Sequence, residues 1–137
     1  MSSDLIRVIL VDDHAVVRAG LKAVLGAARD IDVIGEASNG REAVAMVERL
    51  KPDVVVMDLS MPEMDGLAAT KALSAAETSA RVLILTMHAE DEYLVTLLEA
   101  GASGYLLKSA ADRELVDAVR MVAHGDTYVQ PSAARAL

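Results

Sequence analysis

Four short apolar segments of the chain end in polar side chains that could do chemistry together. These side chains are Asp12 and Asp13, Asp58, Thr86 and Lys108. Carboxylates that crowd together repel one another, and Mg²⁺ bound through their oxygens relieves that repulsion. A lysine adds a compact charge that can pair with a carboxylate or with a phosphoryl oxygen. If one pocket holds all of them, the set predicts a Mg²⁺ site that supports phosphoryl transfer.

Within this set, Asp58 is the candidate nucleophile, because it is the acid that ends the central apolar segment. Carboxylates form aspartyl-phosphates, and a cation and a lysine can stabilise the charge on the phosphoryl oxygens. Thr86 can donate one hydrogen bond to such an oxygen. Each residue taken alone also has a plain structural interpretation, for example Asp12 or Asp13 as a helix N-cap or Lys108 as a solvated lysine.

The sequence contains no motif for a hydrolytic triad, and it has neither a GxxxxGK[ST] loop nor a GxGxxG loop. Its three histidines, His14, His88 and His124, do not have the spacing of a histidine metal site. His14 and His88 lie just beyond segments that end in the polar set, and we interpret both as residues of the pocket rim.

The elements that must position these residues alternate along the chain. Short, β-branched runs predict strands over residues 6–11, 32–37, 54–57, 82–85 and 104–107. Apolar residues at spacings of three and four predict helices over residues 16–28, 41–50, 66–75, 91–100 and 110–124. This alternation is typical of an α/β fold with a doubly wound parallel sheet. Ligands of such sheets bind outside the carboxyl ends of the strands, where the polar set lies.

Composition limits the class of protein. The chain has 137 residues, which corresponds to one domain, and no cysteine, which excludes disulfides and thiol chemistry. Its net charge of −8 argues against this chain alone binding nucleic acid or an anionic membrane. The sequence has no recognisable signal peptide and no apolar run near the ~18 residues of a membrane helix. We therefore expect a cytoplasmic protein.

Four motifs in order carry a family resemblance. They are Val11-Asp12-Asp13-His14, Val56-Met57-Asp58-Leu59-Ser60-Met61-Pro62-Glu63-Met64-Asp65-Gly66, Leu85-Thr86-Met87-His88 and Gly101-Ala102-Ser103-Gly104-Tyr105-Leu106-Leu107-Lys108. With these motifs, the chain resembles the receiver domain of bacterial two-component response regulators. It is most similar to the NarL/FixJ-like subfamily, which carries a LuxR-type helix-turn-helix output domain. The likeness extends from about residue 6 to residue 129.

The resemblance implies a five-stranded parallel sheet of the flavodoxin-like order 2-1-3-4-5, with helices on both faces. It implies that Asp58 accepts a phosphoryl group from a histidine kinase and that Lys108 contacts that group. Mg²⁺ would be held by Asp13 and Asp58, by the backbone carbonyl of Ser60, and by Asp12 largely through water.

Conformational switching is a further implication of the resemblance. Thr86 and Tyr105 would form the switch pair. Once Thr86 is drawn toward the phosphoryl group, the ring of Tyr105 is expected to leave the surface near residues 91–100 and turn inward. A homodimer that forms on phosphorylation is also implied.

The carboxyl-terminal part of the chain departs from the subfamily pattern. We expect residues 1–125 to be the receiver domain and residues 126–137 to begin a linker to an output domain that this chain lacks. The chain would then be a truncated receiver or, in the alternative interpretation, a stand-alone one. DNA binding is implied only through that output domain.

Two other classes of function compete with the signalling switch. A haloacid-dehalogenase-like phosphatase also combines a nucleophilic aspartate with Mg²⁺, but it places a DxD motif after the first strand, where this chain has Asp12-Asp13. A flavodoxin-like binder of a small ligand would need a phosphate-binding loop. We therefore expect no enzyme beyond a domain that catalyses its own phosphorylation and dephosphorylation. Turnover of p-nitrophenyl phosphate would separate a phosphatase from the switch.

Overall fold

The predicted alternation of strands and helices is present in the computed structural model, which describes residues 5–87 and 91–129. Its strands are β1 (Ile6–Val11), β2 (Ile31–Ala37), β3 (Val54–Asp58), β4 (Arg81–Thr86), β5 (Gly104–Leu107) and β6 (Tyr128–Val129). Its helices are α1 (Ala15–Gly26), α2 (Gly40–Leu50), α3 (Gly66–Ala75), α4 (Asp91–Ala100) and α5 (Ala111–Ala123), the last preceded by a 3-10 turn at Lys108–Ala110. Within the described ranges, no helix has the length and apolar character needed to cross a membrane.

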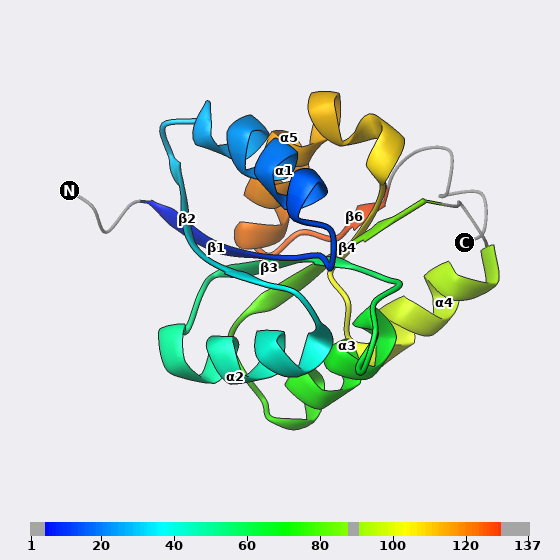
Figure 1. Ribbon diagram of the computed structural model, residues 1–137. Coiled ribbons are helices and arrows are strands. Elements are labelled where there is room, and N and C mark those ends of the chain that lie inside the picture. The colour runs from blue at the N-terminus through cyan, green and yellow to red at the C-terminus, as the bar shows by residue number, and fades with distance from the viewer. Residues whose placement is uncertain (1–4, 88–90, 130–137) are drawn as a thin grey trace.

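The strands form one parallel sheet of order β2-β1-β3-β4-β5-β6. Its first five strands confirm the predicted order 2-1-3-4-5. Each of the first five strands runs parallel to its neighbours, because a helix crosses back along the sheet before the chain enters the next strand. All the carboxyl ends of the strands therefore point to the same edge of the sheet (Figure 1).

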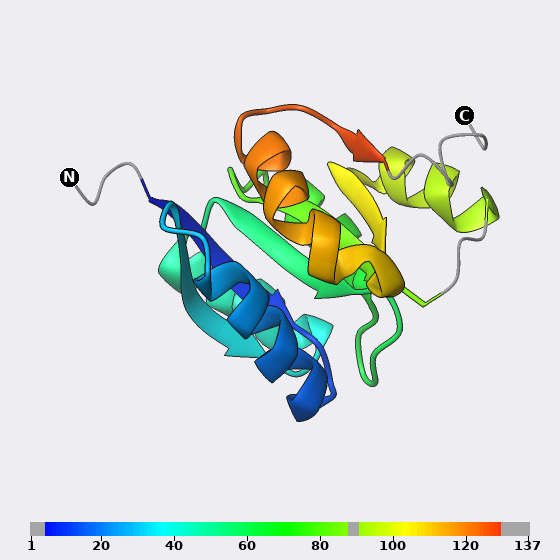
Figure 2. The same cartoon turned by 90° about the horizontal axis from the view of Figure 1, so that it is seen from above.

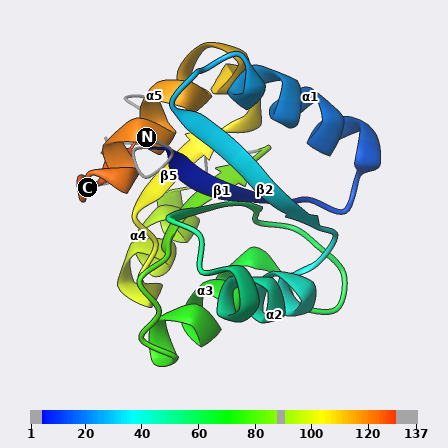
Figure 3. The same cartoon turned by 90° about the vertical axis from the view of Figure 1, so that its left-hand side faces the viewer.

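Buried side chains on both faces of the sheet explain the two layers of helices. In β3, Val55 and Met57 contribute to the core under α2, α3 and α4, whereas Val54 and Val56 contribute to the core under α1 and α5. Figure 3 shows one layer of helices on each side of the sheet, and Figure 2 shows α1 and α5 side by side over one face. Between their polar ends the central strands are apolar, because neither face of the sheet meets water there.

A sixth strand corrects the expectation of five. Tyr128 and Val129, which the sequence analysis assigned to a linker, pair with Gly104 and Tyr105 of β5. The Tyr128 hydroxyl also donates a hydrogen bond to the carboxylate of Glu114 in α5. A two-residue strand has too few positions for a periodic pattern, so only its neighbours could reveal it. The remainder of the expected linker, residues 130–137, lies outside the described residues.

The turn after β3 is closed so tightly that we expect Gly66→Ala to destabilise the fold. A Cβ at Gly66 would lie 2.5 Å from the carbonyl oxygen of Asp58 and 2.9 Å from the Cα of Leu59. Both are backbone atoms, so relief of the clash requires the main chain to move. Overpacking of this kind costs about 1–3 kcal/mol of unfolding free energy.

Urea unfolding followed by far-UV circular dichroism would measure the loss, with Gly20→Ala as the matched control. Gly20 lies inside α1, and a Cβ there meets nothing within 4 Å. That control should gain about 0.5–1 kcal/mol from better helix propensity. A Gly66→Ala variant as stable as the native chain would contradict the packing argument.

Candidate functional site

The carboxyl ends of β1, β3, β4 and β5 bring the predicted polar residues to one edge of the sheet. Asp12 and Asp13 follow β1 directly, Asp58 and Thr86 are the last residues of β3 and β4, and Lys108 follows β5. Asp12, Asp58 and Thr86 are buried, and Asp13 and Lys108 are partly buried. The structure therefore places all five candidates of the sequence analysis around one site.

Lys108 lies between two buried carboxylates. Its Nζ is 2.8 Å from Oδ2 of Asp12 and 3.2 Å from Oδ2 of Asp58. The exposed fractions of these two carboxylate side chains are only 1% and 5%, so solvent screens the ion pairs weakly. The lysine therefore holds the ends of β1 and β3 together from the end of β5.

Burial and charge act in opposite directions on this pair of groups. Burial raises the pKa of Asp58, with a smaller contribution from the nearby Asp12 charge, and Lys108 offsets only part of the rise. Burial lowers the pKa of Lys108, but its hydrogen bond to Asp12 and its attraction to Asp58 more than offset this, so that pKa is raised. The two directions agree physically, because one lysine serves two carboxylates and cannot fully compensate either of them.

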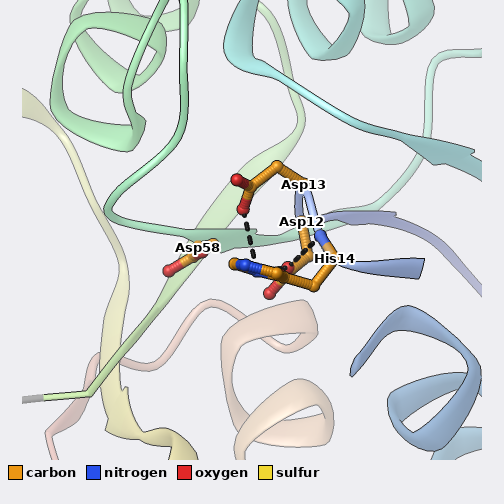
Figure 4. Close-up of side chains that lie close together, drawn as sticks. All are labelled: Asp12, Asp13, His14 and Asp58. Carbon is orange, nitrogen blue, oxygen red and sulfur yellow. Dashed lines mark hydrogen bonds and ion pairs between the residues drawn. The ribbon is translucent and has the colours of Figure 1, made fainter. Parts of the chain in front are cut away.

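The acidic cluster of Asp12, Asp13, His14 and Asp58 has an arrangement that suits a divalent cation (Figure 4). Each residue offers one ligand atom, and these atoms lie within 4.8 Å of one another. Oδ1 of Asp13 is shielded from solvent and has no hydrogen-bond partner among the described residues. An orphaned carboxylate oxygen beside two other carboxylates fits Mg²⁺, which takes oxygen ligands. The donor set therefore fits the Mg²⁺ that the sequence analysis predicted.

The remaining predicted residues border this cluster. A pocket of about 350 Å³ is lined by His14, Val17, Asp58, Ser60, Thr86, Met87 and Lys108. The backbone N–H of Ser60 donates a hydrogen bond of 3.4 Å to Oδ1 of Asp58, which keeps the predicted ligand residue beside the acceptor. Thr86 is 5% exposed at the same pocket. His88 lies outside the described residues.

Tyr105 is not where the sequence analysis expected it before phosphorylation. Its ring is 1% exposed and belongs to the core that also contains Ile84, Leu94 and Leu97. The expected starting position at the surface near residues 91–100 is therefore wrong for this structure. Tyrosine has a large apolar ring, and here that ring is buried in the core on the face of the sheet that α4 covers.

Three supporting interactions, made by Arg18 and Asn39, were missed by the sequence analysis. Nη1 of Arg18 donates a hydrogen bond of 2.5 Å to the carbonyl oxygen of Asp12, and its Nε contacts Glu36 at 3.2 Å. Nδ2 of Asn39 donates to Oε2 of Glu63 at 2.9 Å, in the loop that carries Ser60. The partners Arg18 and Glu36 are 18 residues apart in sequence and Asn39 and Glu63 are 24 apart, so no local pattern could have revealed these two pairs.

The same loop is fixed at a second point. The backbone N–H of Gly40 donates to the carbonyl oxygen of Met64 at 2.9 Å, and a Cβ on Gly40 would lie 2.4 Å from that oxygen. Glu63 has a φ of 67°, a left-handed conformation that is uncommon for a residue with a side chain. The amino-terminal end of α2 therefore holds the loop after Asp58 in place.

Comparison with protein families places these residues in context. The family model described as response regulator receiver domain matches residues 8–120 of this chain. That range contains most of β1, all of β2 to β5 and every residue of the acidic cluster.

Individual relatives give the same result. The oxygen regulatory protein NreC of Staphylococcus carnosus is 44% identical over 126 residues, which are 91% of this chain and 58% of that protein. The transcriptional regulatory protein LiaR of Bacillus subtilis is 43% identical over 130 residues, 95% of this chain and 62% of that protein. A solved LuxR-family two-component response regulator from Aurantimonas is 37% identical with a TM-score of 0.91, covering 96% of this chain and 94% of that one. The chain thus spans about three fifths of the length of the first two relatives.

Proposed function

Because this chain belongs to the response regulator receiver domain family, of the NarL/LuxR type, we propose that it accepts a phosphoryl group on Asp58. One observation carries the proposal: Lys108 Nζ lies 3.2 Å from Oδ2 of Asp58 and 2.8 Å from Oδ2 of Asp12 in a buried acidic cluster. In this arrangement, a carboxylate nucleophile, a positive charge and a cation-binding set lie together at one pocket.

The chemistry that we propose is a simple displacement at phosphorus. An oxygen of the Asp58 carboxylate attacks the phosphorus of a phosphohistidine on a sensor kinase, and the bond between phosphorus and the imidazole nitrogen breaks. The imidazole leaves with the electron pair of that bond, and Asp58 carries the phosphoryl group as an acyl phosphate. Mg²⁺, when bound, supplies positive charge that stabilises the phosphoryl oxygens.

The other residues of the site have supporting roles in this proposal. Asp13, Asp58 and the backbone carbonyl of Ser60 would hold Mg²⁺ directly, and Asp12 would act through water. Lys108 would pair with a phosphoryl oxygen once Asp58 carries the phosphoryl group as an acyl phosphate. Thr86 would donate a hydrogen bond to another phosphoryl oxygen, and with Tyr105 it would transmit the change to the surface near α4.

We extend the proposal to the longer protein from the relatives. LiaR is named a transcriptional regulatory protein, and response regulators in general are phosphorylated by sensor histidine kinases rather than acting as enzymes on separate substrates. In the proposed arrangement, residues 1–125 form the receiver domain and residues 126–137 lead toward an output domain that binds DNA. Phosphorylation would favour a homodimer in the cytoplasm.

The proposal is tested by labelling the chain with acetyl phosphate, a small phosphoryl donor, and measuring its intact mass. In the presence of Mg²⁺, we expect a gain of one phosphoryl group, ~80 Da, and in EDTA we expect no gain, since the cation stabilises phosphoryl charge. Asp13→Asn removes a charged ligand and should weaken Mg²⁺ binding and slow labelling by about tenfold or more.

Asp32→Asn is the matched control for this experiment, because Asp32 is an exposed residue of β2 outside the acidic cluster. It should be labelled at the native rate. Labelling that proceeds equally well in EDTA would contradict the assignment of the acidic cluster to Mg²⁺, and turnover of p-nitrophenyl phosphate would instead favour a phosphatase.

A further inference from the structure

His14 adds a nitrogen ligand to a site that otherwise offers only oxygens. Its ring lies beside the carboxylates of Asp12 and Asp13 and faces the site that Asp58 borders (Figure 4). The sequence analysis interpreted this residue as part of the pocket rim, because the three histidines lack the spacing of a metal site. The structure instead combines one histidine with aspartates.

The contacts of the imidazole have the separation of ligands around one metal ion. Nδ1 of His14 lies 3.3 Å from Oδ1 of Asp12 and 3.1 Å from Oδ1 of Asp13. Ligand atoms that each lie about 2.0–2.2 Å from one metal ion are themselves roughly 3 Å apart. The three atoms therefore need little movement to share a cation.

The carboxylate oxygens beside the His14 ring keep some capacity to bind a metal ion, because hydrogen bonds within the described residues do not occupy all their lone pairs. Oδ1 of Asp12 accepts a short hydrogen bond, 2.8 Å, from the backbone N–H of His14, so the ring contact to the same oxygen is the longer of the two. Oδ1 of Asp13 has no partner with hydrogen-bond geometry within the described part of the chain, although the ring nitrogen is close. A carboxylate oxygen and an imidazole nitrogen that face each other without a hydrogen bond are a pair of available ligands.

The chemical type of a ligand atom determines which cations it binds tightly. Carboxylate and carbonyl oxygens suit Mg²⁺ and Mn²⁺, whereas imidazole suits Ni²⁺, Cu²⁺ and Zn²⁺. The three aspartates and Lys108 together leave two negative charges, which a divalent cation neutralises, and a neutral imidazole adds no further charge. His14 would therefore increase affinity for transition metals and leave affinity for Mg²⁺ nearly unchanged.

We propose that His14 is a ligand that lets the acidic site bind a borderline divalent transition metal, of the Ni²⁺ and Zn²⁺ type, in competition with Mg²⁺. This inference rests on the proposed function, because the same carboxylates would hold Mg²⁺ for phosphorylation. Occupancy by such a metal displaces the cation that phosphorylation uses, so the cation available to the site regulates the switch. Sites with mixed ligands generally bind Ni²⁺ more tightly than Mg²⁺. A high Ni²⁺ affinity alone therefore does not identify His14 as a ligand, but a loss of that affinity in His14→Ala does.

The test measures binding of Ni²⁺ and of Mg²⁺ to the metal-free chain by isothermal titration calorimetry. His14→Ala is expected to weaken Ni²⁺ binding by about tenfold or more and to leave Mg²⁺ binding nearly unchanged. The control is His124→Ala, because the His124 ring lies 2.6 Å from the carbonyl oxygen of Arg120, on α5, and outside the acidic cluster. It should bind both metals like the native chain.

A spectroscopic measurement separates ligation from a structural effect. Electron spin-echo spectra of the Cu²⁺-loaded native chain should contain a ¹⁴N modulation, which His14→Ala should remove and His88→Ala should retain. The side chain of His14 is 67% exposed, so its removal should leave the thermal unfolding curve unchanged.

Three outcomes would overturn the inference. Equal Ni²⁺ affinity in the native chain and in His14→Ala would exclude His14 as a ligand, and so would a loss confined to His88→Ala. A parallel loss of Ni²⁺ and Mg²⁺ affinity in His14→Ala would mean that the imidazole only positions the carboxylates. Failure of the proposed function would be visible separately, as absence of labelling of the native chain by acetyl phosphate with Mg²⁺.

Discussion

Asp58→Asn is expected to abolish phosphorylation of the chain and, at neutral pH, to increase its stability. The amide cannot act as the nucleophile, so the gain of ~80 Da on treatment with acetyl phosphate and Mg²⁺ should disappear. The same substitution removes a buried charge that only part of one lysine compensates, since Lys108 also pairs with Asp12. We therefore expect Asp58 to be needed for phosphorylation, and its buried charge to lower the stability of the folded chain at neutral pH.

The pKa of Asp58 gives the sign of this stability effect with pH. Burial raises that pKa above its ordinary value, so the folded chain holds the proton more tightly than the unfolded chain does. The contribution of Asp58 to stability is therefore fully present below its unfolded pKa and is lost as the pH rises through the raised pKa. The advantage of Asp58→Asn over the native chain should appear over the same pH range.

Chemical denaturation across that pH range, in EDTA, would measure the effect, and intact mass would measure the labelling. The control is Asp126→Asn, because Asp126 is an exposed acid after α5. It should be labelled normally and should show no pH-dependent gain in stability. Labelling of Asp58→Asn at the native level would reject Asp58 as the acceptor, and a variant less stable than the native chain at neutral pH would reject the charge argument.

Lys108→Ala is expected to have the largest effect on stability of any substitution at the site. It leaves two buried carboxylates close together without the lysine that pairs with both of them. Removing one partner of a buried ion pair typically costs about 3–5 kcal/mol, and the 13% exposure of the lysine side chain places this case near the lower end of that range. Labelling by acetyl phosphate should also slow, because the proposed contact to a phosphoryl oxygen is lost.

The charge origin of this loss can be checked in two ways. The loss of stability should shrink as the pH falls through the raised pKa of Asp58, because protonation removes one of the two charges. It should also shrink on addition of Mg²⁺, because a bound cation replaces the missing positive charge.

Lys22→Ala is the matched control for Lys108→Ala. Lys22 is 58% exposed and pairs with Glu36 at 3.5 Å on the surface, where an ion pair contributes about 1 kcal/mol or less. Urea unfolding of both variants, with and without Mg²⁺, would separate a buried charge effect from a general loss of a lysine. Equal losses in the two variants would contradict the proposed role of Lys108.

The parallel sheet and the location of the site could be predicted from the sequence pattern for a physical reason, whereas the order of the strands came from the family resemblance. The runs in β1, β3 and β4 are apolar on both faces, which only a strand between two helix layers can satisfy, so the pattern itself predicts a parallel sheet. Parallel strands share the edge at which they end, so polar residues at those ends must approach one another. Asp12, Asp58 and Lys108 are therefore identifiable from local sequence alone.

Only the tertiary structure decided which of these residues touch and what else supports them. The pairing of Lys108 with Asp12 spans 96 residues, and the contact of Asn39 with Glu63 spans 24. The inward ring of Tyr105 and the short strand β6 likewise depend on how neighbouring elements pack. Hydrophobic periodicity indicates which face of a helix or strand is buried, because each element carries its own apolar face in its sequence. Distances between side chains of different elements depend on register and packing angle, which form only when the whole chain has folded.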